Sequence, residues 1–201
     1  MKVQVIANTP DIENLIYNAA KICYSKEGYI KHYPTEDQLS KFLTFLRDHG
    51  HLSPFEHASI TFSISGISRA CSHQLVRHRI ASYTQKSQRY TDPTNFTAVI
   101  PKTIADSAKA TAIFVKFMDE ASKVYDALRE ENIPAEDSRF ILPNATTTDI
   151  IVTMNIRELI NFFNLRLSKG AQWEIKALAQ NMLKLATNLA PHIFGGVKFG
   201  E

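Results

Sequence analysis

Basic side chains gather in one segment of the chain, where they suit the binding of an anion. Arg77, Arg79 and Arg89 lie within thirteen residues of one another, and the stretch 58–91 contains no Asp or Glu. A guanidinium offers forked donors that match phosphate oxygens, and the Ser, Thr and Gln residues between the arginines add neutral donors. An alternative is that Arg77 and His78 are simply cations at the end of a helix. Because that alternative leaves Arg79 and Arg89 unexplained, the segment predicts an anion-binding site.

A second group of polar side chains lies on one face of a helix that is predicted to begin after Asn155. Arg157, Asn161 and Asn164 follow at i, i+4 and i+7, which places them on one side of that helix. Solvated helix faces are usually built from Lys and Glu, which are better helix formers than Asn. The asparagines therefore indicate hydrogen bonding, for example to a heterocycle. Arg166 lies near the apolar side, where a guanidinium must be paired or must face a ligand.

The histidines and cysteines do not predict a metal site or a nucleophile. Five of the seven histidines fall within thirty residues, but no H-E-x-x-H helix or second ligand pair accompanies them. Cys23 and Cys71 lie on apolar helix faces and are predicted to be core residues. Arg139, taken alone, is predicted to be a solvated surface arginine. Since acids, bases and nucleophiles are few, the pattern favours a site in which a bound cofactor supplies the chemistry.

The overall composition is that of an ordinary globular protein. The chain has 201 residues, of which 44% are apolar and 21% charged, with a formal charge of +3, and this excludes a disordered chain. The absence of a repeat or linker predicts a single domain over residues 1–201. No apolar run approaches the ~18 residues that a membrane span needs, and the N-terminus resembles a strand rather than a signal peptide. We therefore expect a soluble, intracellular protein with no membrane partner.

Apolar periodicity predicts the elements that position these residues. Strands are expected at 2–7, 59–65, 95–100 and 148–154. Helices are expected from Thr9-Pro10 to Cys23, from the Thr35/Gln38 capping box to Gly50, from Ser68 to about His78, over 104–132, after Pro134, from Asn155 to about Ser168 and over 171–190. The polar, aperiodic stretch 80–93 predicts an ordered binding loop. The predicted fold class is α+β, with a small mixed or antiparallel sheet packed with six or seven helices.

Four motifs resemble those of the flavin-dependent thymidylate synthases, and they occur in that family's order. Arg77-His78-Arg79, followed after seven residues by Ser87, matches the R-H-R-x7-S signature of the family. The other three matching elements are the histidine segment 49–57, the R-x-x-L-P element 139–143 and the C-terminal helices over 155–174. The resemblance spans about Lys2 to Pro191.

The resemblance implies an enzyme that converts dUMP to dTMP. Methylene-tetrahydrofolate would donate the carbon, NADPH would be the reductant, and FAD would bind between the subunits of a cytoplasmic homotetramer. The family reduces the pyrimidine with flavin-derived hydride rather than attacking it with a thiolate, which agrees with the lack of an activated cysteine. No metal and no nucleic acid are implied.

Site residues follow from the resemblance position by position. The implied dUMP ligands are Gln74, Arg77, Ser87, Gln88, Arg89, Arg139 and Arg166. The implied catalytic residues are Arg166, which would polarise the uracil, and Ser87. The implied FAD contacts are His51, Ser53, Glu56, Arg77, His78, Arg79, Gln85, Asn155, Arg157 and Asn161.

Three positions depart from the family pattern, one of which is Cys23 in the first helix region, where Ser is common. Gln85 stands where some members carry a carboxylate, and Gly170 stands where many carry His or Arg beside the flavin.

Two other hypotheses remain open at this point. The arginines could bind nucleic-acid phosphates, which predicts steeply salt-dependent binding and a colourless protein. Alternatively, the chain could be an inactive relative that keeps nucleotide binding for regulation.

Overall fold

Strand β2 illustrates how the sequence builds the sheet. In the computed structural model, which describes residues 1–90 and 97–201, β2 spans Ser59–Ser68. Its alternate apolar side chains are fully buried, namely Ile60, Phe62 and Ile64. On its other face the hydroxyl group of Thr61 lies 2.9 Å from that of Thr153. The alternation predicted this strand, and the structure confirms it and extends it to Ser68.

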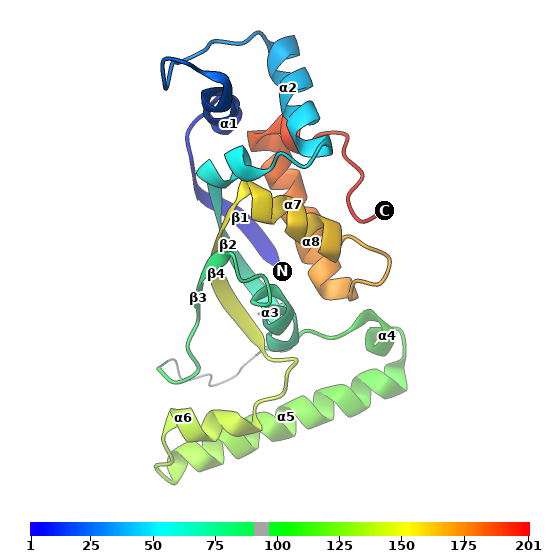
Figure 1. Cartoon of the computed structure of the whole chain (residues 1–201). Helices are drawn as coiled ribbons and strands as arrows, with labels where there is room; N and C mark the ends of the chain where they lie inside the picture. Colours follow the sequence, from blue (N-terminus) through cyan, green and yellow to red (C-terminus); the bar gives the residue numbers. More distant parts are fainter. Residues whose placement is uncertain (91–96) are drawn as a thin grey trace. The chain divides into compact units, whose positions relative to one another are not determined.

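The four strands form one sheet in the order β1-β2-β4-β3 (Figure 1). Their bounds are Lys2–Asn8 for β1, Ser59–Ser68 for β2, Ala81–Gln85 for β3 and Thr147–Asn155 for β4. Thr61 pairs with Thr153, and the amide of Gly66 donates to the carboxylate of Asp149. Because the residue number rises along β2 as it falls along β4, these two strands are antiparallel. The α+β class is confirmed.

The chain divides into two compact units whose segments alternate along the sequence. Unit 1 comprises Met1–Lys2, Ile64–Leu75 and Thr84–Ile150, and unit 2 comprises Val3–Ser63, Val76–Tyr83 and Ile151–Glu201. All four strands of the sheet contribute residues to both units, β1 with Lys2 alone in unit 1. The expectation of a single domain over 1–201 stays a prediction.

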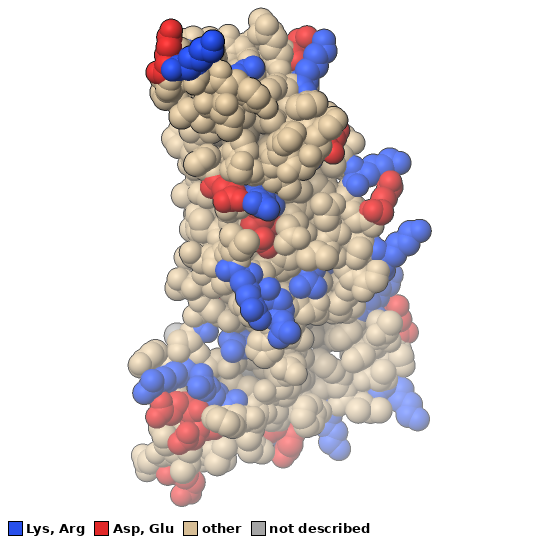
Figure 2. All heavy atoms as spheres, viewed as in Figure 1, with Lys and Arg blue, Asp and Glu red and all other residues tan. Residues whose placement is uncertain are grey.

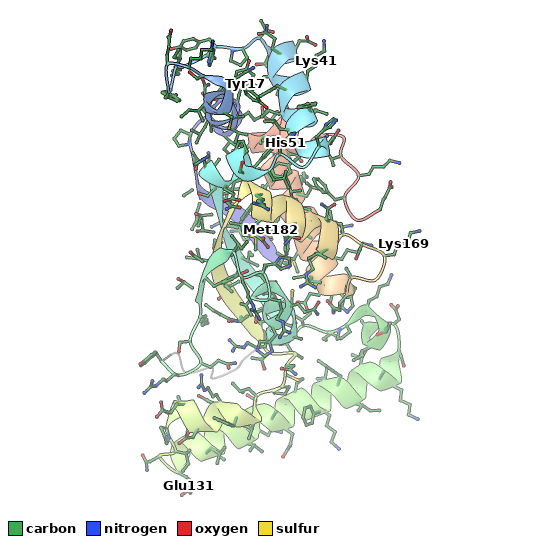
Figure 3. All side chains as sticks on the ribbon, in the orientation of Figure 1. Tyr17, Lys41, His51, Glu131, Lys169 and Met182 are labelled. Atoms are coloured by element: carbon green, nitrogen blue, oxygen red, sulfur yellow. The ribbon has the colours of Figure 1, made fainter. Side chains whose placement is uncertain are left out.

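Unit 2 holds helices that pack around an aromatic core. They are α1 (Ile12–Lys21), η1 (Ile22–Tyr24), α2 (Glu36–Asp48), η2 (Ser53–His57), α7 (Ile156–Arg166), α8 (Trp173–Leu189) and α9 (Pro191–Phe194). Phe163 makes T-shaped ring contacts with Phe162 and Phe194, each at 5.6 Å between centroids. Helices α7 and α8 lie side by side (Figure 1), and Met182 of α8 is fully buried (Figure 3). This packing gives α7 a rigid base.

Two predicted helix starts in unit 2 are confirmed. The side chain of Thr35 accepts from the amide of Gln38, whose own side chain accepts from the Thr35 amide, which completes the capping box of α2. The side chain of Asn155 accepts from the amide of Glu158 at 2.8 Å and so begins α7. Both starts could be predicted because a cap depends on side chains only three residues apart.

Two predictions for the first helix are wrong, namely its start at Thr9-Pro10 and the burial of Cys23. The helix begins at Ile12 after Asp11, which has a left-handed backbone, whereas the hydroxyl of Thr9 accepts from the amide of Ser59. The Thr9 hydroxyl is thus engaged by the first residue of β2 and does not cap the helix. The helix also ends at Lys21, so Cys23 falls in the short η1 turn and is exposed.

Unit 1 contains the other helices among the described residues. They are α3 (Arg69–Leu75), α4 (Lys102–Ala105), α5 (Ala108–Glu130), α6 (Ala135–Ser138) and η3 (Arg139–Ile141). Ser68 caps α3 as predicted, because its hydroxyl accepts from the amide of Cys71. Helix α3 ends at Leu75 rather than near His78. The predicted helix 104–132 is divided into α4 and α5, because the side chain of Ser107 caps the start of α5.

Two further sequence predictions in unit 1 need correction. Part of the predicted loop 80–93 is strand β3, which is polar because it lies at the edge of the sheet and buries neither face fully. The predicted strand 95–100 is absent from its described part, where Ala98 forms only an isolated bridge to Thr146. Residues 91–96 lie outside the described residues. Within the described ranges, no helix has the length and apolar character needed to cross a membrane.

Candidate active site

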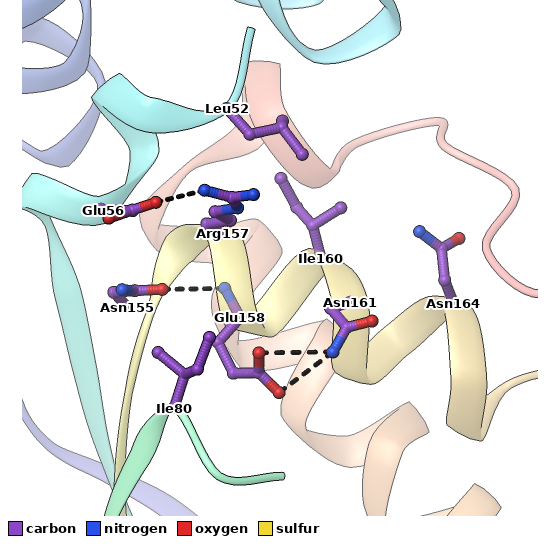
Figure 4. Close-up of a pocket in the computed structure, with 9 residues that line it drawn as sticks. All are labelled: Leu52, Glu56, Ile80, Asn155, Arg157, Glu158, Ile160, Asn161 and Asn164. Atoms are coloured by element: carbon purple, nitrogen blue, oxygen red, sulfur yellow. Dashed lines mark hydrogen bonds and ion pairs between the residues drawn. The ribbon is translucent and has the colours of Figure 1, made fainter. Parts of the chain in front are cut away.

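The first turns of α7 carry the polar side chains that the sequence singled out. Arg157 pairs with Glu56 of η2, and both side chains are about half exposed. Asn155 is occupied in capping the helix, and Asn161 donates to the carboxylate of Glu158 at 3.2 and 3.3 Å. Of these contacts, which are drawn in Figure 4, the pair of Arg157 with Glu56 joins α7 to η2, and the others order the polar face of α7 itself.

Beneath this face, a buried carboxylate, a histidine and an arginine form a chain of hydrogen bonds. Nδ1 of His78 lies 2.7 Å from Oε1 of Glu158. The Nε–H group of Arg166, at the end of α7, donates to Nε2 of His78 at 3.0 Å. His78 and Glu158 are each only 4% exposed. The requirement that Arg166 be paired or face a ligand is therefore met at least in part by His78.

Burial shifts the acid–base properties of this cluster. The pKa of His78 is lowered, first because burial disfavours the imidazolium and second because the charge of Arg166 lies nearby. The hydrogen bond to Glu158 acts in the opposite direction but does not overcome burial. The pKa of Tyr83 is raised by burial and by the charge of Glu158, and its hydroxyl donates to the carbonyl of His78 at 2.8 Å. Burial of the ring and the charge of Arg166 thus favour the neutral imidazole of His78 over the imidazolium.

A cavity of about 470 Å³ opens beside this cluster within unit 2. Its apolar wall consists of Leu52, Ile80 and Ile160, and α7 provides amide, carboxylate and guanidinium groups (Figure 4). Its polar lining residues are Glu56, Asn155, Arg157, Glu158, Asn161 and Asn164. Such a mixture of flat apolar surface and a few polar groups suits a ring system with heteroatoms at its edge.

The predicted flavin contacts are brought together only in part. Glu56, Asn155, Arg157 and Asn161 line the cavity, whereas His78 lies buried behind it. His51, labelled in Figure 3, and Ser53 lie in the preceding segment and at the start of η2, both exposed. Arg77 and Arg79 are exposed and do not line the cavity. Figure 2 shows that basic side chains gather on the same face as α7.

Gln85, the remaining predicted flavin contact, belongs to unit 1 and is held by two hydroxyl groups. Its amide nitrogen lies 3.0 Å from Oγ of Ser72 and 3.1 Å from Oγ1 of Thr148. Ser72 and Thr148 are buried. The neutral amide thus satisfies two oxygens, in a position where some family members carry a carboxylate.

The predicted substrate residues of unit 1 follow directly after β3. The hydroxyl of Ser87 accepts from the amide of Arg89 at 3.1 Å. The guanidinium of Arg89 pairs with Glu136 at 2.5 Å, and both side chains are substantially exposed. Gln88 is half-buried in the same segment, and Gln74 is half-buried on α3. Because the Arg89 ion pair is solvated, a phosphate can compete with Glu136 at modest cost.

Arg139 has a neighbouring guanidinium that sequence reasoning missed. Arg139 is half-buried and its Nε–H group donates to the carbonyl of Glu136 at 3.0 Å. The pKa of Arg69 is lowered by burial and then by the charge of Arg139. Arg139 is thus not the fully solvated arginine predicted from its segment alone. Two like charges held close to each other attract anions. Arg69 could have been noticed because it lies in the same acid-free stretch as Arg77.

Glu158 is the second residue that sequence reasoning missed. It occupies the third helical position after the Asn155 cap, where a Glu normally reaches back to complete a capping box. Here its carboxylate accepts from His78 and Asn161 instead. The spacing signal was present, but only the tertiary fold brings His78, eighty residues away, to this carboxylate.

The structure gives further findings on metals and thiols. Among the described residues there is no group of three or more His, Cys, Asp or Glu side chains that could hold a metal ion. Cys71 is buried, as predicted, whereas Cys23 is exposed, and both are free thiols.

Comparison with known proteins identifies the family. Residues 4–192 match the family model described as thymidylate synthase complementing protein. The chain is 48% identical over 198 residues to a flavin-dependent thymidylate synthase of Geobacter sulfurreducens, covering 96% of this chain and 85% of that protein. It is 41% identical over 212 residues to one of Clostridium tetani, with the same coverages, and 43% identical over 201 residues to one of Saccharolobus solfataricus, covering 96% and 75%. The chain therefore belongs to the family of flavin-dependent thymidylate synthases.

Proposed function

We propose that this enzyme methylates dUMP to dTMP with FAD as its cofactor, methylene-tetrahydrofolate as carbon donor and NADPH as reductant. The observation that carries the proposal is the position of Arg166. Arg166 ends helix α7, another face of which lines a cavity suited to a ring system, and its guanidinium is held by the buried side chain of His78. Membership of the family supports the same reaction.

The residues around the cavity fit a flavin. Leu52, Ile80 and Ile160 offer apolar surface to the flat ring, and Asn161 and Asn164 offer amide groups to its polar edge. The pair of Arg157 with Glu56 is half exposed, so that the guanidinium can also contact a cofactor phosphate. Bound flavin supplies the hydride transfer that no side chain of this chain can perform.

The electron balance of the reaction explains why a reductant is needed. The bridging carbon of methylene-tetrahydrofolate must gain a hydride to become the methyl group of dTMP. If NADPH provides these two electrons, the overall products are dTMP, tetrahydrofolate and NADP⁺, and one proton is consumed. The folate is then not oxidised. None of these steps requires a thiolate, which agrees with the burial of Cys71.

Arg166 is proposed to act on the pyrimidine. As hydride arrives, negative charge develops on the ring carbonyl, and a fixed guanidinium stabilises that charge without having to reorganise. The contact with His78 holds Nε of Arg166 in place before the substrate binds. Ser87, the other proposed catalytic residue, follows β3 in unit 1, where its hydroxyl already positions the backbone of Arg89.

The arginines of unit 1 are proposed to bind the phosphate of dUMP. Arg89 and Arg139 are the predicted ligands, with Gln74 and Gln88 as neutral donors, and the further predicted ligand Arg77 is exposed. The pKa of Arg69 is lowered first by burial and then by the charge of Arg139, and an anion bound there would relieve the repulsion between the two cations. The phosphate does not change charge during the reaction, so these residues serve binding.

We also infer that the enzyme is a homotetramer in the cytoplasm. Helix α5 exposes large apolar residues on one stripe, with Ile113 64%, Phe117 60% and Val124 42% exposed. Such a stripe supports burial against another subunit. The two free thiols support a reducing compartment. Light scattering of the purified enzyme tests the assembly, and Phe117→Asp is expected to weaken it.

The proposed reaction is tested by omitting its co-substrates one at a time. Purified protein with FAD should form dTMP from dUMP when both methylene-tetrahydrofolate and NADPH are present. Omission of either should abolish product formation, and product chromatography measures the result. A protein that takes up no flavin and forms no dTMP, but binds DNA with a steep salt dependence, would overturn the proposal.

A further inference from the structure

The hydrogen bonds around His78 determine which of its ring nitrogens carries the proton. Arg166 can only donate through Nε, because a guanidinium has no acceptor. Nε2 of His78 lies 3.0 Å from that group and must accept. A neutral imidazole then carries its proton on Nδ1, and this proton points at Oε1 of Glu158, 2.7 Å away. Both hydrogen bonds thus run in one direction, from Arg166 to His78 and from His78 to Glu158.

The surroundings hold this order in place. The carboxylate of Glu158 also accepts from Asn161, and the ring of Phe162 packs edge-on against the imidazole at 4.9 Å between centroids. The hydroxyl of Tyr83 donates to the carbonyl of His78 rather than to its ring. Among the described residues, the charged groups that act on the His78 ring are Glu158 and Arg166 of α7, and the hydroxyl of Tyr83 of β3 contacts the His78 carbonyl.

We propose that Glu158 is a positioning residue, which holds His78 as the Nδ1–H tautomer and thereby fixes the guanidinium of Arg166 toward the pyrimidine. This inference rests on the proposed function of Arg166. Glu158 itself need touch neither substrate nor flavin to act in this way. Its effect passes through one imidazole ring, whose two nitrogens are both used.

The alternative states of His78 show why the carboxylate matters. If the proton sits on Nε2, that nitrogen points an N–H group at the N–H group of Arg166, and the contact is lost. A doubly protonated ring has the same effect and adds a repulsive charge. Burial makes the charged ring unfavourable, as the lowered pKa indicates. Between the two neutral tautomers, the acceptor oxygen of Glu158 selects Nδ1–H.

Two variants of Glu158 separate positioning from packing. Glu158→Gln keeps an oxygen that accepts from Nδ1–H, so the tautomer and the contact to Arg166 are retained. Glu158→Leu has a similar size but no acceptor, so a buried Nδ1–H group would be left unsatisfied. The proton should then move to Nε2, and the half-buried guanidinium of Arg166 should turn away from the ring. Glu13→Gln is the matched control, since Glu13 is similarly buried at 8% exposure and its carboxylate accepts from backbone amides at His192 and Ile193.

The first readout is independent of activity. In flavin-loaded enzyme labelled with ¹⁵N-histidine, proton–nitrogen correlation spectra report which nitrogen of each ring is protonated, and His78→Asn assigns the signal. We expect Nδ1–H in the wild type, in Glu158→Gln and in Glu13→Gln, and Nε2–H in Glu158→Leu. An Nε2–H ring in the wild type would overturn the proposal whatever the enzyme's substrate is.

The second readout is the rate at which reduced flavin is reoxidised by saturating dUMP with methylene-tetrahydrofolate. Loss of groups that orient a functional residue typically costs about 10–100-fold, and we expect a loss of this size in Glu158→Leu. Glu158→Gln and Glu13→Gln should remain close to the wild type. Equal reoxidation rates in Glu158→Leu and Glu158→Gln would overturn the proposal that Glu158 positions Arg166, but would not count against the synthase function. Failure of the wild type to be reoxidised would instead count against the proposed function.

Discussion

The arginines of the two units are held in contrasting ways. In unit 2, Arg166 is half-buried and bonded to a neutral histidine that is itself anchored by a buried carboxylate. In unit 1, Arg89 is exposed and pairs with Glu136, which is also exposed. A buried network with fixed donors is costly to rearrange, whereas a solvated ion pair exchanges partners easily. The first arrangement suits a group that must be preorganised for catalysis, and the second suits a group that captures and releases a substrate phosphate.

The largest expected effect comes from removing the preorganised arginine. Arg166→Ala should slow flavin reoxidation by about 10²–10³-fold at saturating dUMP, the usual cost of losing one donor to developing charge. Reduction of the flavin by NADPH should be preserved, because Arg166 is assigned to the pyrimidine. Stopped-flow absorbance measures both half-reactions. Full recovery of the rate at high dUMP would show that Arg166 serves binding instead.

Removing Arg89, the arginine of the solvated ion pair, should change the affinity of the enzyme for dUMP. Arg89→Ala should weaken dUMP binding by about 1.5–3 kcal/mol, the value of a hydrogen bond to a charged group. Isothermal titration with dUMP measures the loss. Glu136→Gln is the matched control, because it removes the competing carboxylate and should leave dUMP affinity unchanged or tighter. Weaker binding in Glu136→Gln would contradict the view that Glu136 is displaced by the phosphate.

The buried network also makes the stability of the protein depend on pH. The pKa of His78 is lowered in the folded state, so the unfolded chain binds a proton more readily as the pH falls below about 6.5. The contribution of neutral His78 is therefore complete above that pH and is lost as the pH falls through the lowered pKa. Urea unfolding between pH 5 and pH 8 should show a steeper acid loss in the wild type than in His78→Gln. Identical slopes would argue against a buried neutral imidazole.

The smallest effects are expected from the cysteines, one in each unit. Cys71→Ala should lower the free energy of unfolding by about 1 kcal/mol, because the side chain is 1% exposed. Cys23→Ala should change it by less than about 0.5 kcal/mol, because the thiol is exposed. Both variants should retain synthase activity, which a coupled dTMP assay checks. Loss of turnover in a folded, flavin-bound variant would reveal a thiolate mechanism.

Local signals predicted the fold well where the determining residues are close in sequence. The Thr35/Gln38 capping box, the Asn155 cap and the alternation of β2 depend on neighbours within a few residues, and all three are confirmed. Strand β3 was missed because its position at the sheet edge leaves it polar. The start of the first helix was misplaced because Thr9 bonds a residue fifty positions away.

The candidate site of unit 2 was predicted only in part. Spacing along one helix found Arg157, Asn161 and Asn164, which all line the cavity. It also flagged Arg166 as needing a partner, but it could not name His78. Glu158 went unnoticed because its partner lies on another segment of the chain. Patterns within one element are visible in sequence, whereas contacts between elements require the fold.

The most direct test of the contrast between the two arginines is a single stopped-flow experiment. Reduced enzyme is mixed with methylene-tetrahydrofolate and a series of dUMP concentrations, and flavin absorbance is followed for the wild type, Arg89→Ala and Arg166→Ala. The account predicts that Arg89→Ala reaches the wild-type reoxidation rate at high dUMP, whereas Arg166→Ala stays slow at every concentration. Recovery of Arg166→Ala together with a persistently slow Arg89→Ala would contradict it.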